Sequence, residues 1–240
     1  MVRRGRLVAV EGGSASGKTS LVTRAAHTLG WRALPEAFDR LDPAPSLAFA
    51  SAPELVQLEA RLLAEETRRY RDARRLCAAG FSVLADTGFL GPLTYTLGLV
   101  ELELAPASLA NELVTRARSL VRAGRLGIPD LTVYLRTTAR ERVDRARAGS
   151  SRHPAGLFRR HEAVGRFERR FFERDFSAVR PTGVRILRAD GPTVVLARRL
   201  GRIVTADRVP PASRGEALAL LARLEVPAPE IRRSTGRPNR

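Results

Sequence analysis

The segment Gly12 to Thr19, GGSASGKT, constrains the fold of this 240-residue chain more than any other feature. It fits the pattern G-x-x-x-x-G-K-[ST], in which backbone N–H groups curl around phosphates and the next helix N-terminus adds a favourable dipole. The apolar run RLVAVE precedes the motif, and apolar residues at helical spacing follow it. The order strand, glycine-rich turn and helix predicts a phosphate-binding loop in an α/β fold.

Lys18 is the single lysine in a chain whose lysine and arginine residues total 42. A compact ammonium group can reach the β and γ phosphates of a nucleotide, whereas the planar fork of arginine has a different shape. We therefore predict that Lys18 is catalytic and that the Thr19 hydroxyl is a ligand of Mg²⁺. The residues expected to bind ATP are Gly12, Gly13, Ser14, Ala15, Ser16, Gly17, Lys18, Thr19 and Ser20.

Five short apolar runs alternate with helical patterns along the chain. The expected strands are 6–11, 31–37, 81–86, 129–137 and 183–190, of which the second runs out into a loop at Pro35. This alternation predicts the three-layer P-loop NTPase fold, an α/β architecture with a five-stranded parallel sheet and helices on both faces. We expect one domain over residues 1–206 and a Pro- and Arg-rich C-terminal appendage over 207–240 that is partly disordered.

Two acidic residues follow the expected second and third strands, where ligands of open α/β sheets bind. Asp86 ends the apolar run FSVLAD, which suits a ligand of Mg²⁺, and Glu36 follows the second strand in LPEA, which suits a base that accepts a hydroxyl proton. A turn cap is the alternative for Asp86, and a solvated loop acid is the alternative for Glu36. The sequence leaves open which of the two is the base.

The segment from Arg140 to Arg174 contains eleven arginines and five acidic residues. Part of it, about residues 145–157, is expected to form an arginine-rich lid that neutralises charge on a transferring phosphoryl group and excludes water. Arg145, Arg147 and Arg152 are the catalytic candidates, because they flank a glycine that could act as a hinge. A solvated helix face with ordinary side-chain ion pairs is the alternative.

The net charge of +17 indicates anionic partners, which include nucleotides and nucleic acid. Aromatic residues make up 5% of the chain and form no stacking motif, so nucleic acid is not the favoured partner. The single cysteine, Cys77, fits a cytoplasmic protein, and no apolar run is long enough to predict a membrane span. The oligomeric state is left open, a homodimer included.

The chain resembles the deoxynucleoside kinase and thymidylate kinase group of P-loop phosphotransferases. Four segments between residues 6 and 205 carry the resemblance: VAVEGGSASGKTSL, LPEA, AGFSVLAD and PDLTVYLRTTARERVDRAR. It implies transfer of the γ-phosphoryl group of ATP to a nucleoside or nucleotide. By position, Glu36 resembles the glutamate that acts as base on the sugar hydroxyl.

The sequence departs from both families after the third strand. Asp86 stands where deoxynucleoside kinases have the acid of a Glu-Arg-Ser motif, but Thr87 and Gly88 follow it, and thymidylate kinases have an Asp-Arg pair there. A hydroxyl acceptor is therefore favoured over a monophosphate, and the acceptor can be a nucleoside or a similar small molecule. The remaining alternatives are a nucleoside monophosphate kinase, an antibiotic O-phosphotransferase, a polynucleotide 5′-hydroxyl kinase and a regulatory ATPase.

Overall fold

The computed structural model describes residues 4–43, 52–147, 164–206 and 209–226. Its five strands are β1 (Leu7–Glu11), β2 (Arg32–Leu34), β3 (Val83–Asp86), β4 (Leu131–Arg136) and β5 (Val184–Arg188). Its longer helices are α1 (Lys18–Leu29), α2 (Ala52–Ala78), α3 (Gly91–Glu101), α4 (Ala107–Arg122), α5 (Ala139–Arg145), α8 (Thr193–Ala206) and α9 (Arg214–Arg223). Residues 164–170 are also helical and continue into the π-helical turn η3 (Phe171–Phe176) and α7 (Ser177–Val179). The short 3-10 turns are η1 (Phe38–Arg40) and η4 (Pro181–Gly183).

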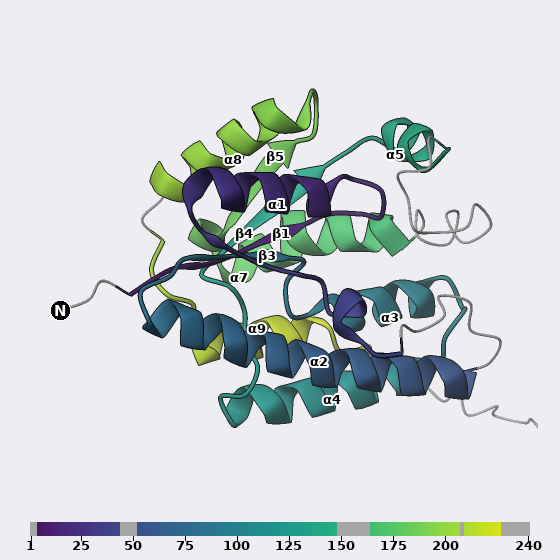
Figure 1. The fold of residues 1–240 in the computed structure, drawn as a ribbon. Helices are drawn as coiled ribbons and strands as arrows, with labels where there is room; N and C mark the ends of the chain where they lie inside the picture. Colours follow the sequence, from purple (N-terminus) through teal and green to yellow (C-terminus); the bar gives the residue numbers. More distant parts are fainter. Residues whose placement is uncertain (1–3, 44–51, 148–163, 207–208, 227–240) are drawn as a thin grey trace, which may run out of the picture.

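All five strands are parallel and lie in the order β2-β3-β1-β4-β5. Helices α1 and α8 cover one face of the sheet, and α2, α3, α4 and α9 lie on the other, which gives three layers (Figure 1). The prediction of a three-layer α/β fold is confirmed. Because β3, β1 and β4 are adjacent and parallel, the loops that follow these strands lie next to one another at the same edge of the sheet.

Alternation along the strands divides the buried residues between two cores. Val8 and Val10 pack with α1 and α8, whereas Leu7 and Ala9 pack with the larger core around α2, α3 and α4. Successive side chains of a strand point to opposite faces, so this division fixes where the last residue of each strand points. Glu11 therefore lies on the α2 face, whereas Asp86, the β3 partner of Val10, lies on the α1 face with Leu84.

The C-terminal segment 209–226 packs against the domain, although we expected an appendage from residue 207 onward. The α9 side chains Leu220 and Leu221 are fully buried in the core on the α2 face. Arg180 joins this segment to the sheet through the carbonyl oxygens of Asp130 and Pro210. Although the segment is rich in proline and arginine, the apolar residues of α9 are spaced so that they form one buried helix face. Residues 227–240 lie outside the described residues.

No helix within the described part of the chain combines the length and apolar character that a membrane span requires.

Candidate nucleotide and acceptor site

The loop between β1 and α1 has the backbone geometry of a phosphate cradle. Gly17 caps α1 with a φ of 91°, a conformation that side chains rarely adopt, and its carbonyl oxygen accepts the first helical hydrogen bond, from Leu21. A Cβ at Gly13 would lie 2.4 Å from Nη1 of Arg142, so a side chain there would displace this guanidinium group. The loop can therefore approach an anion closely with its backbone N–H groups.

Lys18 lies at the centre of this loop. Its ammonium group donates to the carbonyl oxygens of Gly12 and Gly13, at 2.7 and 3.3 Å. The hydroxyl groups of Ser14 and Ser16 are buried and have no hydrogen-bond partner among the described residues. The loop thus combines one cation with hydroxyl groups whose hydrogen-bonding capacity is unused, as a phosphate site requires.

Asp86 is 2% exposed, and neither of its carboxylate oxygens has a hydrogen-bond partner among the described residues. Its side chain lies on the sheet face covered by α1, the helix whose first turn carries Thr19. Oxygen ligands of this kind suit Mg²⁺, which usually keeps waters and phosphate oxygens among its ligands. In the described residues no cluster of three or more histidine, cysteine or acidic side chains could hold a metal by itself. The site thus fits a metal ion that arrives with phosphates.

The predicted lid arginines lie in different surroundings. Arg145 donates to the carbonyl oxygen of Ser16 in the phosphate loop at 2.6 Å and to that of Ala189 at 3.2 Å. Arg147 is exposed where the helix ends, and Arg152, with most of the expected lid, lies outside the described residues. Arg145 is therefore the one predicted arginine that the structure brings to the phosphate loop.

Arg142 approaches the loop more closely than we expected from the sequence. Its side chain is buried, its Nη1 lies against Gly13, and its Nε has no hydrogen-bond partner in the described part of the chain. It precedes Arg145 by three residues, so both side chains project from the same face of α5. The three-residue spacing could have predicted that Arg142 lies beside Arg145. The sequence contains many arginines, however, and does not show which one packs inward.

A cavity of about 400 Å³ begins at the phosphate loop and extends between α2 and α3. Gly12 and residues 14–20 form one end of it. Glu36 lines the same cavity, so the predicted phosphate site and the predicted base share one space. Tyr95 also lines the cavity, whereas Phe89 is buried in the core against Tyr70.

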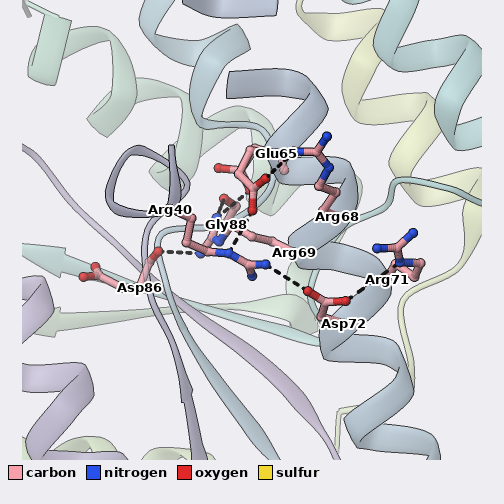
Figure 2. A network of polar contacts seen from close by, with 9 residues as sticks. Arg40, Glu65, Arg68, Arg69, Arg71, Asp72, Asp86 and Gly88 are labelled. Atoms are coloured by element: carbon pink, nitrogen blue, oxygen red, sulfur yellow. Dashed lines mark hydrogen bonds and ion pairs between the residues drawn. The ribbon is translucent and has the colours of Figure 1, made fainter. Parts of the chain in front are cut away.

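Helix α2 holds the loop that carries Glu36. Arg40, in η1 just after Glu36, forms ion pairs with Glu65 at 2.8 Å and Asp72 at 3.0 Å, two residues of α2 (Figure 2). Because these acids lie two turns apart on one helix, Arg40 is fixed between them. These ion pairs hold the loop after β2 against α2 at Arg40, four residues after the candidate base Glu36.

Helix α2 also reaches the loop that follows β3. Arg69 is fully buried, pairs with Glu66 at 2.5 Å, and donates to the carbonyl oxygen of Asp86 at 2.7 Å. It further contacts the carbonyl oxygens of Thr87 and Gly88, and the carboxylate of Asp86 points away from it (Figure 2). The loop after β3 has no arginine in its own sequence, and Arg69 of α2 instead donates hydrogen bonds to its backbone.

Burial changes the protonation of four glutamates around the cavity. It raises the pKa of Glu11 and of Glu59 to about 8 and the pKa of Glu66 and of Glu168 to about 7. In Glu11 a hydrogen bond from the Gly88 N–H opposes this rise, and in Glu66 the charge of Arg69 opposes it. These carboxyl groups therefore exchange protons near neutral pH.

Sequence reasoning missed the roles of Glu59, Glu66 and Glu168 in lining this cavity. A signal existed in α2, since Glu59 and Glu66 are seven residues apart and share the helix face of apolar Leu55 and Leu62. Glu168 had no comparable signal, because it lies among charged residues and reaches the cavity through the packing of helix 164–170.

Several solved structures share this arrangement of strands and helices. The deoxyadenosine kinase of M. mycoides with bound dATP matches with a TM-score of 0.64 and 13% identity, over 83% of this chain and 99% of that chain. The thymidylate kinase of Candida albicans matches with a TM-score of 0.61 and 17% identity, over 85% of this chain and 93% of that chain. No family model and no curated protein sequence matches this chain. The resemblance seen in the sequence is thus confirmed at the level of structure, and the chain has the fold of the P-loop deoxynucleoside and thymidylate kinases.

Proposed function

We propose that this protein is an ATP-dependent kinase that transfers the γ-phosphoryl group to a hydroxyl group of a nucleoside or a similar small molecule. The observation that carries the proposal is the shared cavity, in which Lys18 and the phosphate loop face Glu36. Phosphoryl transfer depends mainly on positioning and charge, and a phosphate cradle opposite a carboxylate supplies both. The similar solved structures, which are kinases of a nucleoside and of a nucleotide, support the same reaction class.

In this reaction the phosphate loop binds the triphosphate of ATP and Lys18 contacts its β and γ phosphates. Thr19 and Asp86 would hold Mg²⁺, which would neutralise phosphate charge. Arg142 and Arg145 are the arginines next to the loop that could stabilise the transferring group, because both contact its backbone or lie against it.

Glu36 is proposed to accept the proton of the acceptor hydroxyl as the oxygen attacks phosphorus. It lines the cavity, whereas Asp86 points to the face of α1, so this geometry favours Glu36 as the base. None of the described residues that line the cavity is an arginine, which disfavours a monophosphate as acceptor.

The test compares variants of the two ends of the cavity. Lys18→Ala should lower turnover by about three orders of magnitude, since it removes the cation beside the transferring group. Glu36→Gln should lower kcat by roughly 10² to 10⁴, with ATP affinity within about twofold, because a base acts in the chemical step. A coupled ADP-release assay with a nucleoside panel measures turnover, and calorimetry with a nonhydrolysable ATP analogue measures affinity.

Arg24→Ala is the matched control, since Arg24 lies exposed on the outer side of α1. It should leave both quantities unchanged. Near-normal turnover of Lys18→Ala would refute the kinase proposal. Equal losses of turnover and ATP affinity in Glu36→Gln would remove Glu36 from the role of base.

A further inference from the structure

The cavity is acidic in a protein that is strongly basic. Five of its described lining residues are acidic, and Lys18, at the phosphate end, is the one cation among them. The chain as a whole carries a net charge of +17. The acidic lining residues are Glu11, Glu36, Glu59, Glu66 and Glu168. This cluster of acidic side chains concerns the acceptor end, because the phosphates are expected at the other end.

Two of these carboxyl groups have partners within the protein. Glu11 accepts a hydrogen bond from the N–H of Gly88 at 2.6 Å, and Glu66 pairs with the guanidinium group of Arg69. Their charge and hydrogen-bonding capacity are therefore partly met by the fold.

Glu59 differs from them. Its side chain is 1% exposed, it lines the cavity, and its Oε2 has no hydrogen-bond partner among the described residues. Buried polar atoms are nearly always paired, so an unpaired carboxylate oxygen at a cavity wall indicates a position for a ligand group. Glu59 precedes Glu66 by seven residues, so it lies on the same face of α2, about 10 Å further along the helix axis.

Apolar residues line the same cavity as Glu59. They include Leu58 and Leu62 of α2, Phe38 of η1 and Pro92 of α3. A wall that combines apolar side chains with a carboxyl oxygen lacking a partner among the described residues suits a hydrophobic scaffold that carries a cation, because a carboxylate in such surroundings pairs best with an opposite charge.

We propose that the acceptor carries a basic amino group in addition to its reactive hydroxyl, and that Glu59 binds this group as an alkylammonium ion. The inference rests on the proposed kinase function and specifies the class of its acceptor as an amino alcohol with an apolar scaffold. The ammonium group lies at Glu59, and the hydroxyl group lies at the Glu36 end. Neutral and anionic alcohols are the poorer ligands, because neither pairs with the Glu59 carboxylate.

The test measures binding alone, with two probes of similar shape. Phenethylamine is a cation at about pH 8.5, like other alkylamines, and 2-phenylethanol is its neutral counterpart. Calorimetry or ligand-observed NMR, in the presence of a nonhydrolysable ATP analogue, should show that the full chain binds the amine at least about tenfold more tightly than the alcohol.

Glu59→Gln should reduce this preference to about twofold or less, because it keeps the side-chain shape and removes the charge. Glu112→Gln, an exposed position on α4, should keep the full preference. Equal binding of the two probes to the unmodified chain, or a preference that survives Glu59→Gln, would overturn the proposal. Near-normal turnover of the Lys18→Ala variant would refute the kinase function but would leave the preference for the amine intact. The failures of the two proposals are therefore distinguishable.

Discussion

At the scale of single residues, the informative groups are buried polar atoms without partners. Asp86 and Glu59 both hold carboxylate oxygens that no described group contacts, one on each side of the sheet's carboxyl edge. Burying such groups lowers stability, so a fold that retains them is expected to use them with a ligand. Asp86 lies at the position proposed for phosphates and a metal ion, and Glu59 lines the part of the cavity proposed for the acceptor.

The raised pKa of Glu59 predicts a pH-dependent effect on stability. Burial raises this pKa from 4.5 to about 8, so the folded protein keeps a proton that the unfolded chain releases near pH 4.5. The free energy of unfolding therefore falls as the pH rises from about 4.5 to about 8. Glu59→Gln removes this contribution, and we expect its melting temperature to exceed that of the unmodified chain by about 3 °C or more near pH 8.5.

The same comparison near pH 4 is the control for this prediction. There the carboxyl group is largely protonated in both the folded and the unfolded chain and resembles the amide, so the two melting temperatures should differ little. A difference that is the same at both pH values would contradict a titrating Glu59. Differential scanning fluorimetry over a pH series measures it.

At the scale of elements, α2 organises the site. It contributes Glu59 and Glu66 to the cavity wall, holds the loop after β2 through Arg40, and holds the loop after β3 through Arg69. Two segments that carry candidate catalytic groups are thus fixed to one rigid helix (Figure 2). A catalytic arrangement that depends on positioning gains from such a support.

Arg69→Met tests this role of α2. The substitution leaves the Glu66 carboxyl group and the carbonyl oxygens of residues 86–88 without their buried partner. Breaking a buried ion pair by removing one member costs about 3 to 5 kcal/mol, measured by urea unfolding. Arg68→Met, at an exposed position on the same helix, should cost less than about 1 kcal/mol. Similar losses for the two variants would contradict the role assigned to Arg69.

At the scale of the whole molecule, the C-terminal segment completes the core. Helix α9 packs against α4, and Asn111 exchanges hydrogen bonds with the backbone of Val226 at 3.1 and 3.2 Å. Arg180 connects α9 to the same assembly by pairing with Glu216. The stability of the domain is therefore expected to depend on residues far from the nucleotide loop.

Leu220→Ala measures how strongly α9 contributes. The side chain is fully buried, so its loss should lower the free energy of unfolding by about 2 to 5 kcal/mol. Leu218→Ala, at a partly buried position of the same helix, should cost less than half as much. If both substitutions cost little in urea unfolding, α9 does not belong to the cooperative core.

Much of the fold could be predicted from the sequence because its signals are local. The apolar runs predicted all five strands, and the helical spacing after the motif predicted the helix that the structure shows as α1. The second strand, Arg32–Leu34, ends directly before Pro35, where the sequence predicted that the chain leaves the strand. The glycine-rich loop before α1 could be predicted equally well, since its glycine and lysine positions belong to one short motif.

The sequence by itself determined the glycine-rich loop before α1, the α/β layers and the two acids at the strand ends. Only the tertiary structure decided which side chains share a space: that Glu59 and Glu168 face Glu36 across one cavity, that Arg142 packs against Gly13, and that α9 joins the core. The physical reason is distance along the chain. Local spacing fixes the conformation of a segment, whereas contacts between remote segments depend on how helices pack on the sheet, which no short pattern encodes.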